Sequence, residues 1–594
     1  MRHVLYDLET DGVNPEICTP TLGGFLVWET GQEPEYVWTS NINEMAMLLN
    51  QANVVIGWNN EGFDNVIMKR FGVSFYGKTI IDLMPVIHGK HFGNGVGRNA
   101  IMFTPEGKPL NKACRTKKLA DTTIALGGPH KIGDFDYSLF KKPFGILSKE
   151  QQDEALEYLE ADINATKYIF DYTDKFFEFF RDGSLSLPWG ERYFLTDEQR
   201  QKFSHINAST ASLVYKALCN LCDLPEKYAQ NVETQHFGGG FVADPEVETA
   251  KGKIYCLDYN SLYPHIMMQA NLYQKGGWSG TGISTTVGSY DGNNMGRVAE
   301  CLKLLYAERQ RLKGIGDKRE YTIKIIINTM YGLLGNPVFA SVADYTAAED
   351  CTKLGQQWVK AARLHFKENG YKTLYTDTDS VYVLDPFNDK KRLLDCKDKH
   401  IADIKKSVPF PQDTFDMGVD DEIKFIAFSK KEDRLLKKNY LYVTNAGKLK
   451  IKGLKIIKSN CTRLSRKIFD TFIKSEIIDN SKHKFQKSQF EKWIYDLLSV
   501  DKTLASVFYR VKSAQSYAIS SQIQAMIANH PLYGEGSHQF IKTRERHPKG
   551  AGVDGTYVGV QFADEIRLTQ IDFDVVWSEL EPFIEETQKT LFNF

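Results

Sequence analysis

The sequence predicts a multidomain α/β protein. A chain of 594 residues is too long to fold around one hydrophobic core and is expected to divide into several domains. Near the N-terminus, short apolar strands at 3–9 and 53–58 precede a long helical stretch at 150–180, which is typical of a layered α/β fold. Stretches rich in Gly, Ser and Pro at 181–190 and 273–296 predict breaks between compact parts.

The later sequence mixes both kinds of element. Periodic apolar positions predict three helices, at 297–314, 319–335 and 352–370. They also predict a β-hairpin at 372–385 and basic strands at 438–456. The remaining residues look mostly helical, with a basic, Gly-rich interruption at 544–557. No internal repeat is found, so a repeat architecture is not expected.

Composition is that of a soluble globular protein, with 42% hydrophobic and 25% charged residues. The sequence contains neither an apolar run of about 18 residues nor a signal-peptide pattern at the N-terminus, so we expect a cytosolic protein without a membrane span. Nine cysteines without a framework indicate reduced thiols. Cys219 and Cys222 form a CxxC, but a zinc site needs two more ligands, so we interpret them as two half-buried thiols.

Charge is distributed unevenly along the chain. The formal net charge is only −1, yet lysines and arginines crowd the segment from Lys424 to Lys474. Acidic clusters elsewhere, at 420–422 and 579–586, cancel this excess. The basic segment therefore predicts a local site for a polyanion.

Three acids in the second half are candidate metal ligands. Asp258 ends an apolar strand, and Asp377 and Asp379 flank the turn of the expected hairpin. Carboxylates crowded in this way repel one another unless a hard cation such as Mg²⁺ binds them, usually together with phosphates. An EF-hand is excluded because its sixth position requires Gly, and Tyr382 stands there. Taken alone, a DTD turn is more often a solvated hairpin tip.

Four acids in the first half form a second candidate set. Asp7 and Glu9 alternate on the first strand, so both carboxylates face the same side. Asp64 and Asp162 come from two later segments, and Tyr158 precedes Asp162 by one helical turn. Four acids from three segments can converge on a pair of metals and activate a water for phosphodiester hydrolysis. A DxE pair alone is usually structural.

Several motifs of the second half resemble those of family B DNA polymerases. DYNSLYPHIM at 258–267 and YTDTDS at 375–380 resemble the two metal-binding palm motifs of that family. KIIINTMYG at 324–332 resembles its fingers motif, and LLYAERQRLK at 304–313 resembles the partner helix. The order of these motifs is that of the family, so chance agreement is negligible compared with a single pattern match.

Further motifs extend the resemblance. HFGGGFV at 236–242 is similar to the Gly-rich element between exonuclease and polymerase. KKNY at 437–440 and KGLKIIKSN at 452–460 are similar to the clamp on the primer duplex. In the first half, the order DxE, NxxxFD and YxxxD resembles a DEDD-type 3′→5′ proofreading exonuclease, with Asn59 at the usual spacing and Asn60 fitting a shorter variant.

The resemblance implies a catalytic role for the acids. Asp258 and Asp377 would bridge two metals with help from the Tyr259 carbonyl, and Asp379 would support them. The nuclease acids would hold a second pair of metals, while Tyr158 orients the attacking water. The implied nuclease metal ligands are Asp7, Glu9, Asp64 and Asp162.

Binding residues follow from the same resemblance. One face of a helix would carry Lys324, Asn328 and Tyr331, so these three side chains can contact the same nucleotide. On another helix Arg309 and Lys313 lie one turn apart, so both cations can point at one triphosphate. Tyr263 would exclude a 2′-OH. The implied nucleotide-binding residues are Leu262, Tyr263, Arg309, Lys313, Lys324 and Asn328. The implied DNA-binding residues are Asn59, Phe63, Gly238, Gly239, Tyr331, Gly332, Lys437, Lys438, Tyr440, Lys452 and Lys458.

The implied fold is an RNase H-like exonuclease domain followed by a right-hand polymerase with palm, fingers and thumb. We place the exonuclease at 1–175 and a linker with N-terminal palm elements at 176–250. The remaining expected boundaries are palm 251–275, fingers 276–336, palm 337–460 and thumb 461–594.

Departures from the family narrow the expectation. The exonuclease motifs begin close to the N-terminus, which is typical of the compact viral or mobile-element branch, in the host cytoplasm if viral. The intervals from Asp258 to Lys324 and from Gly332 to Asp377 leave little room for the insertions linked to protein priming and strand displacement, so we expect neither. The clamp carries Asn439 and Lys458 where Arg is frequent, which weakens bidentate contacts.

We expect two Mg²⁺ ions in each active site, with Mn²⁺ as a possible substitute. The expected partners are primer-template DNA and dNTPs, with a helicase, a single-strand binding protein or a processivity factor as further candidates, and the chain is expected to be a monomer. Three alternatives stay open: a protein-primed polymerase, an exonuclease whose C-terminal half only binds DNA, and a non-catalytic DNA-binding protein of the replication fork.

Overall fold

The computed structural model describes most of the chain as two compact units. The described residues are 1–88, 104–105, 113–114, 116–129, 135–201, 210–230, 232–233, 238–275, 288–317, 319–458, 461–511, 536–542, 560–562, 571 and 573–585, and side chains are described except at 174–179, 181, 200–201, 210, 507–511, 536–542 and 560–562. His236 of the Gly-rich element, Asn460 of the clamp and the interruption at 544–557 lie outside them. The first unit comprises 1–236, 267–279 and 287–349, and the second 237–266, 280–286 and 350–594.

A five-stranded mixed sheet organises the N-terminal part of the first unit. Its order is β3-β2-β1-β4-β5, with β1 (Arg2–Thr10) at the centre. On one side, β2 (Pro20–Glu29) and β3 (Glu35–Thr39) run antiparallel, and on the other β4 (Val54–Gly57) and β5 (Thr79–Asp82) run parallel. The strands expected at 3–9 and 53–58 are therefore neighbours in one sheet.

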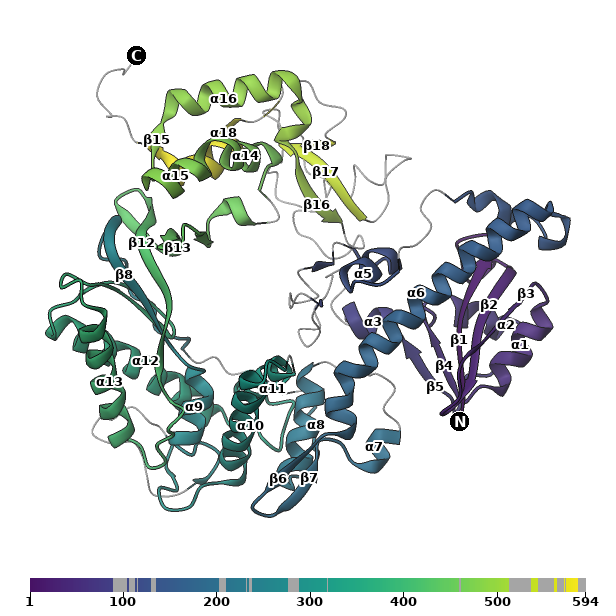
Figure 1. The fold of residues 1–594 in the computed structure, drawn as a ribbon, viewed down its shortest axis with the longest axis horizontal. Coiled ribbons are helices and arrows are strands. Elements are labelled where there is room, and N and C mark those ends of the chain that lie inside the picture. The colour runs from purple at the N-terminus through teal and green to yellow at the C-terminus, as the bar shows by residue number, and fades with distance from the viewer. Residues whose placement is uncertain are drawn as a thin grey trace. The chain divides into compact units, whose positions relative to one another are not determined.

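Helices cover both faces of this sheet (Figure 1). Residues such as Val4 and Tyr6 of β1 face α1 (Ile42–Gln51) and α2 (Asp64–Arg70) in one core. The alternate residues, beginning with Leu5, share a second core with α3 (Leu83–His88), α5 (Leu119–Ala125) and α6 (Lys149–Asp182). Because side chains alternate along a strand, Asp7 and Glu9 belong to the face that α6 covers. The short helices η1 (Tyr137–Lys141) and η2 (Phe144–Ile146) pack near the start of α6.

The rest of the first unit is mainly helical. A hairpin of β6 (Ser184–Leu187) and β7 (Gly190–Tyr193) occupies the stretch that we expected to be a break, since Gly190 at φ 103° permits the tight turn. The helices are α7 (Asp197–Gln201), α8 (Thr210–Cys222), α10 (Arg297–Gly314) and α11 (Glu320–Leu334). All nine cysteines are free and buried, so Cys219 and Cys222 are more deeply enclosed than the half-buried thiols we expected.

A six-stranded antiparallel sheet organises the second unit. Its order is β10-β11-β8-β12-β13-β14. The strands are β8 (Thr249–Tyr259), β10 (Lys372–Asp377), β11 (Ser380–Leu384), β12 (Met417–Lys431), β13 (Arg434–Thr444) and β14 (Leu449–Lys452). The hairpin expected from 372 to 385 is formed by β10 and β11, and it pairs with β8.

The two faces of this sheet have different neighbours. On one face Tyr259 donates a hydrogen bond to the Trp358 carbonyl in α12 (Tyr345–Glu368), and its hydroxyl also lies 2.5 Å from His400 Nε2 in α13 (Lys390–Lys406). The other face carries a tyrosine cluster, defined by Tyr375, Tyr382, Tyr440 and Tyr442. Asp258 lies on the same face as this cluster, at the end of β8. The short helix α9 (Leu262–Gln269) follows it.

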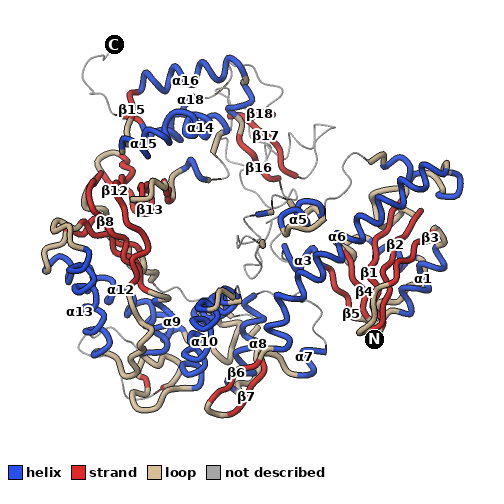
Figure 2. Tube along the Cα trace, in the orientation of Figure 1, coloured by secondary structure: helices blue, strands red, loops and turns tan. Residues whose placement is uncertain are grey.

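Helices and a small sheet make up the C-terminal part of the second unit (Figure 2). They share a core with Phe425 and Leu441 of the six-stranded sheet. The elements are η3 (Lys455–Ile457), α14 (Arg463–Ile468), η4 (Phe469–Ile473), α15 (Lys474–Asn480), β15 (Phe485–Gln486), α16 (Lys487–Val500), η5 (Lys502–Ala505), α18 (Phe573–Leu580), η7 (Glu581–Phe583) and β19 (Ile584–Glu585). A three-stranded sheet of β16 (Val507–Val511), β17 (Gly536–Lys542) and β18 (Val560–Phe562) corrects our expectation of mostly helix. Among the described helices, none is long and apolar enough to cross a membrane.

Two candidate acidic sites

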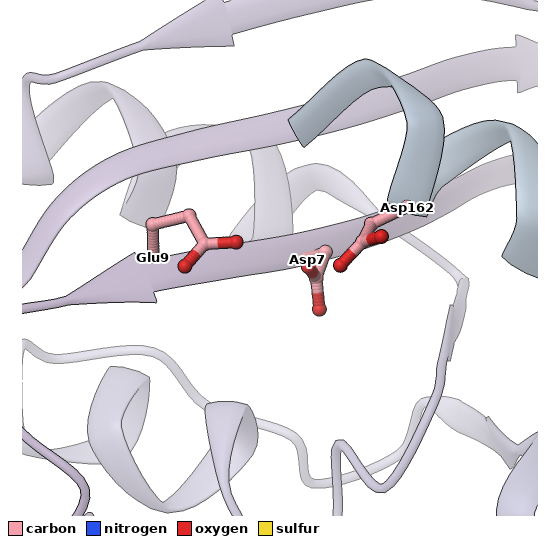
Figure 3. A group of neighbouring side chains, drawn as sticks. All are labelled: Asp7, Glu9 and Asp162. Carbon is pink, nitrogen blue, oxygen red and sulfur yellow. The ribbon is translucent and has the colours of Figure 1, made fainter. Parts of the chain in front are cut away.

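The first acidic site lies between β1 and α6 of the first unit. Asp7 and Glu9 project from β1, and Asp162 projects toward them from α6 (Figure 3). Each carboxylate offers one oxygen, and these oxygens all lie within 4.8 Å of one another. Among the residues that the structure describes, no other group of three or more Asp, Glu, His or Cys side chains brings its potential ligand atoms this close together. The arrangement fits a hard divalent cation, because all its donors are carboxylate oxygens.

A glycine allows α6 to approach the sheet closely. Gly24 on β2 pairs with Asp7 on β1. A Cβ at Gly24 would lie 2.9 Å from Leu159 Cγ and 3.1 Å from Ile163 Cγ1, both on α6. These two residues flank the turn that carries Asp162. Gly24 therefore determines how near Asp162 comes to Asp7, a role that no sequence motif indicated.

Asp64 is the fourth acid of the predicted set. It is the first residue of α2 and is 3% exposed. Burial, followed by the charges of Asp7 and Glu9, raises its pKa well above the ordinary value for an aspartate. A carboxyl whose charged form is disfavoured by neighbouring acids would be stabilised in that form by a cation. Asp64 is thus electrostatically part of the site that the other three acids form.

Tyr158 lies on α6 one turn before Asp162, as its spacing predicts. Its hydroxyl is 3.0 Å from that of Tyr137, and its ring stacks on Phe135 at 4.2 Å. Burial, then the Tyr137 hydrogen bond and the charge of Glu9, raise the pKa of Tyr158, so its hydroxyl keeps its proton at neutral pH. Sequence reasoning missed Tyr137, which comes from η1 and carries no motif of its own.

The predicted DNA contacts of this site lie on the loop between β4 and α2. Asn59 is half-buried and has a left-handed backbone, with φ at 62°. Phe63 is half-buried and immediately precedes α2. Both residues therefore belong to the segment that leads directly into Asp64.

The second acidic site spans three strands of the second unit. Ser380 on β11 pairs with Asp258 on β8 and with Asp377 on β10. Directly paired residues project to the same face, so Asp258, Ser380 and Asp377 form a row. Two strand spacings of about 4.8 Å each separate the backbones of the two acids. This separation explains why these acids do not form a group as close as that of Asp7, Glu9 and Asp162.

Asp379 occupies the turn beside this row. The Tyr259 N–H donates to its carbonyl at 2.9 Å, while the Tyr259 side chain is buried on the opposite face. Burial, followed by the charges of Asp377 and Asp420, raises the pKa of the Asp379 carboxyl. The oxygen donors and their mutual repulsion again fit a hard divalent cation.

The Gly-rich segment supports the turn. The Thr378 N–H donates to the Phe241 carbonyl at 2.8 Å, and Thr378 has φ at 59°. A Cβ at Gly240 would lie 2.7 Å from Thr378 Cγ2 and 3.0 Å from the Tyr263 hydroxyl. Gly240 is therefore the tight position, whereas a Cβ would meet no atom within 4 Å at Gly239 and only Gln356 Nε2, at 3.8 Å, at Gly238. The sequence motif predicts a role for Gly238 and Gly239, which are exposed, and does not indicate that Gly240 is the constrained position.

Tyr263 and Leu262 begin α9 close to this turn. A Cβ at Gly355 of α12 would lie 3.1 Å from Tyr263 Cε1 and 3.5 Å from Leu262 Cδ2. Leu262 is buried, and Tyr263 is half-buried. Of these two predicted nucleotide contacts, only Tyr263 has substantial exposed surface.

A lysine faces the second acidic site. Lys438 Nζ lies 3.1 Å from Asp377 Oδ1, and the Lys438 N–H donates to the Tyr375 hydroxyl at 2.9 Å. Lys438 has φ at 58°, and a Cβ at Gly453 would lie 1.8 Å from its carbonyl oxygen. The local backbone therefore depends on Gly453 and directs this ammonium group toward the acid.

The other clamp residues have different surroundings. Lys437 Nζ donates to the Val242 carbonyl at 2.9 Å and lies 3.5 Å from Asp244. Tyr440 is 2% exposed, and its hydroxyl is bonded to that of Tyr382, so it does not reach the surface that Lys438 occupies. Lys452 and Lys458 are exposed, without an ion pair among the described residues.

The predicted triphosphate contacts lie on α10 and α11 of the first unit. Arg309 Nε donates to Glu320 Oε2 at 3.1 Å, and its guanidinium lies 5.7 Å from the Tyr306 ring centre. Lys313 is exposed, and Lys324 Nζ lies 5.6 Å from the Tyr321 ring centre. Glu320, at the start of α11, was not expected. The exposed or half-buried residues of α11 on the face of Lys324 are Asn328, Tyr331 and Gly332.

A family model described as DNA polymerase family B matches residues 197–275 and 297–536, which is more than half of the chain. The chain belongs to DNA polymerase family B. The match includes Asp258, Asp377 and the lysines of the clamp, so the resemblance of the motifs in the second half to this family is confirmed. The motifs between Asp7 and Asp162 lie outside the matched residues. The viral or mobile-element branch stays a prediction.

Archaeal relatives of this family B chain are distant. DNA polymerase 1 of Pyrococcus abyssi is 25% identical over 270 residues, which cover 42% of this chain and 33% of that protein. DNA polymerase 1 of Saccharolobus solfataricus is 27% identical over 293 residues, which cover 48% and 30%. The aligned region thus spans about a third of the length of these curated relatives.

A solved structure has the same overall fold. The family B DNA polymerase of the hyperthermophilic archaeon Pyrobaculum calidifontis aligns with all of this chain and with 78% of that chain. The TM-score is 0.51 at 15% sequence identity. This likeness confirms a mixed α/β fold of the family B type.

Proposed function

We propose that this family B chain is a template-directed DNA polymerase with its own 3′→5′ proofreading exonuclease. The observation that carries the proposal is the row of Asp258, Ser380 and Asp377 across three paired strands, within the part that matches the family model. The separate group of Asp7, Glu9 and Asp162 supports the second activity.

The proposed reaction adds nucleotides from dNTPs to a primer. The primer 3′-OH attacks the α-phosphate, a phosphodiester bond forms, and pyrophosphate leaves. Asp258 and the hairpin acids would hold two divalent cations, for which Mg²⁺ is the proposed ion and Mn²⁺ a substitute. Such a metal pair stabilises the attacking and leaving oxygens.

We further propose that all three acids contribute to this site. Asp379, whose carboxyl pKa is raised first by burial and then by its acidic neighbours, would hold a supporting place beside Asp258 and Asp377. Tyr263 would contact the sugar of the dNTP. Lys438 would neutralise Asp377 before the substrates arrive and contact the primer afterwards.

Nucleotide and DNA binding would use several groups of cations. Arg309, Lys313 and Lys324 would bind the triphosphate, since phosphate is best held by arginine and lysine in a fixed geometry. Asn328, Tyr331 and Gly332 would contact the nascent base pair. The basic segment, including Lys437, Lys452 and Lys458, would bind duplex phosphates without reading sequence.

The proposed nuclease removes a nucleotide from a primer 3′ end. Asp7, Glu9, Asp64 and Asp162 would hold its metals, Tyr158 would orient water, and Asn59 and Phe63 would bind the single strand. We assign the exonuclease to 1–175, a linker with N-terminal palm elements to 176–250, the palm to 251–275 and 337–460, the fingers to 276–336 and the thumb to 461–594. We further propose that the protein extends existing primers as a monomer in the cytoplasm.

A primer-extension assay on a gapped duplex tests the proposal. With Mg²⁺ and dNTPs, we expect synthesis up to the downstream strand and degradation when dNTPs are omitted. Asp377→Ala should abolish extension and leave degradation, whereas Asp7→Ala with Glu9→Ala should do the reverse. Loss of both activities in either variant contradicts the two-site proposal, and degradation without extension in the unaltered protein favours a nuclease whose second half only binds DNA.

A further inference from the structure

The loop from 58 to 63 contains a left-handed backbone position. Asn59 adopts φ at 62°, a region that asparagine enters more readily than other non-glycine residues and that local hydrogen bonds stabilise. The loop connects β4 to α2 and ends one residue before Asp64. Whatever fixes this backbone also fixes where α2, and with it Asp64, begins.

Asp82 is the residue that fixes it. Its Oδ1 accepts hydrogen bonds from the Asn59 N–H at 2.8 Å and the Met84 N–H at 3.2 Å, while its Oδ2 accepts one from the Glu61 N–H at 3.1 Å. Asp82 ends β5 and pairs with Gly57, the last residue of β4. The carboxylate therefore stands beside the point where the loop leaves the sheet.

The other side of the loop is tied to β1. The Asn65 N–H donates to the Asn60 carbonyl at 2.7 Å, and Asn65 Oδ1 accepts a hydrogen bond from the Tyr6 hydroxyl at 2.6 Å. Tyr6 immediately precedes Asp7 on β1. The loop is thus held between the strand that carries Asp7 and Glu9 and the carboxylate of Asp82.

This carboxylate is kept at an electrostatic cost. Asp82 is 3% exposed, and burial raises its pKa to about 6 in spite of three backbone donors. A neutral side chain of similar size would avoid the buried charge, but only a carboxylate accepts from donors on both its oxygens. The need for a carboxylate at position 82 therefore comes from the backbone N–H groups that the loop directs toward it.

We propose that Asp82 is a positioning residue of the nuclease site, which holds the 58–63 loop so that Asn59 and Asp64 face the acids on β1. The inference rests on the proposed exonuclease and extends it to a residue outside the motifs. Asp82 acts through the loop backbone and does not touch the DNA or the metals.

The test compares Asp82→Ala and Asp82→Asn in degradation of a single-stranded oligonucleotide. Asp82→Ala loses all three bonds, and we expect kcat/KM to fall about 10- to 100-fold, with a higher KM because Asn59 moves. Asp82→Asn keeps Oδ1 and its two donors but presents an NH₂ group to the Glu61 N–H, so we expect a loss of about 3- to 10-fold. Primer extension should stay within about twofold of the unaltered protein. Amide exchange at Asn59 and Glu61 should accelerate in the same order.

Two control variants separate positioning from stability. Asn41 caps the N-terminus of α1, a helix that packs on the same five-stranded sheet, by accepting a hydrogen bond from the Asn43 N–H. Asn41→Ala should therefore lower the stability of this part of the first unit without contacting the 58–63 loop, and KM for degradation should not change. Asp385, 5% exposed, immediately follows β11 in the second unit and accepts hydrogen bonds from the Phe387 and Asp389 N–H groups at 2.9 Å. Asp385→Ala should leave degradation unchanged.

Each outcome decides a different question. Degradation at the unaltered rate in a folded Asp82→Ala protein overturns the positioning role. Where Asp82→Ala does not fold, the same result in Asp82→Asn overturns it. An equal rise of KM in Asn41→Ala would reduce the effect to general destabilisation and also overturn it. If Asp7→Ala with Glu9→Ala leaves degradation intact, the proposed exonuclease itself is wrong.

Discussion

The two acid sets are built in different ways. Asp7, Glu9 and Asp162 bring oxygens within 4.8 Å of one another from one strand and one helix. Asp258 and Asp377 stand on strands separated by β11, and Lys438 faces Asp377. A close set has most of its metal ligands in the protein, whereas an open set leaves coordination positions for substrate phosphates. This difference agrees with the two proposed activities, which are hydrolysis by water at the first site and nucleotide transfer with metals that arrive with a triphosphate at the second.

The strongest test removes one acid from each set. Asp162→Asn should lower degradation by about 10³-fold or more, and Asp258→Asn should do the same to extension, because each loses a charged metal ligand. Steady-state rates of both reactions measure this. Asp171→Asn, on the same helix, and Asp403→Asn, on α13, both in exposed pairs with lysines, are the controls. A shared loss of both activities would show that the two sets are not independent.

The pH dependence of stability should differ between the unaltered protein and Asp82→Asn. Burial raises the pKa of Asp82 to about 6, so the folded state binds this proton more tightly than the unfolded chain. The protonated Asp82 therefore adds to the free energy of unfolding. This contribution is fully present below about pH 4 and is lost as the pH rises through about 6, and it amounts to about 3 kcal/mol at most. Asp64, whose pKa is also raised, acts in the same direction.

Asp82→Asn should remove the part that Asp82 contributes. The measurement is the free energy of unfolding in urea between pH 4 and pH 7, compared for the two proteins. If the free energy of unfolding changed equally with pH in the two proteins, burial would not raise the pKa of Asp82.

The close set should depend on the approach of α6. Gly24→Ala places a Cβ 2.9 Å from Leu159 Cγ, so α6 must shift away from β1. Overpacking of this kind costs about 1 to 3 kcal/mol, and the displaced Asp162 should reduce degradation about 10-fold while extension is unaffected. Gly145→Ala, where a Cβ meets nothing within 4 Å, is the matched control. Unchanged degradation would mean that the three acids tolerate a wider spacing.

The open set should bind metal more tightly without its lysine. Lys438→Met removes the cation 3.1 Å from Asp377, so the Mn²⁺ affinity measured by calorimetry without DNA should rise at most about fivefold, since the competing charge interaction is worth up to about 1 kcal/mol. Lys431→Met, an exposed lysine at the far end of β12, should not change it. Weaker Mn²⁺ binding would show that Lys438 orients Asp377 for the metal.

The sequence predicted those features that depend on local spacing. The 3.6-residue period placed α10 and α11 closely, and the two-residue alternation put Asp7 and Glu9 on one face. The pairing of β8 with the hairpin was not predictable from spacing, because Asp258 and Ser380 meet only through long-range register.

Contacts made through the backbone or through the absence of a side chain were missed. Gly24, Gly240 and Asp82 act by what they leave space for or by the N–H groups they accept. Such residues have no periodicity and stand outside the motifs, so only the folded structure identifies them. The burial of Tyr440 was missed for a related reason, since its partner Tyr382 is 58 residues away.

The length of α6 has a mechanical consequence. It is one continuous helix of 34 residues, about 50 Å at 1.5 Å per residue, and it leads from the acids directly into β6. Inserting one residue after Asp162 would turn everything beyond it by about 100° about the helix axis and shift it by about 1.5 Å. Insertions and deletions in α6 should therefore be tolerated only when the number of residues added or removed restores the original rotation about the helix axis. The length of α6 should then be under as strong a constraint as the identity of Asp162.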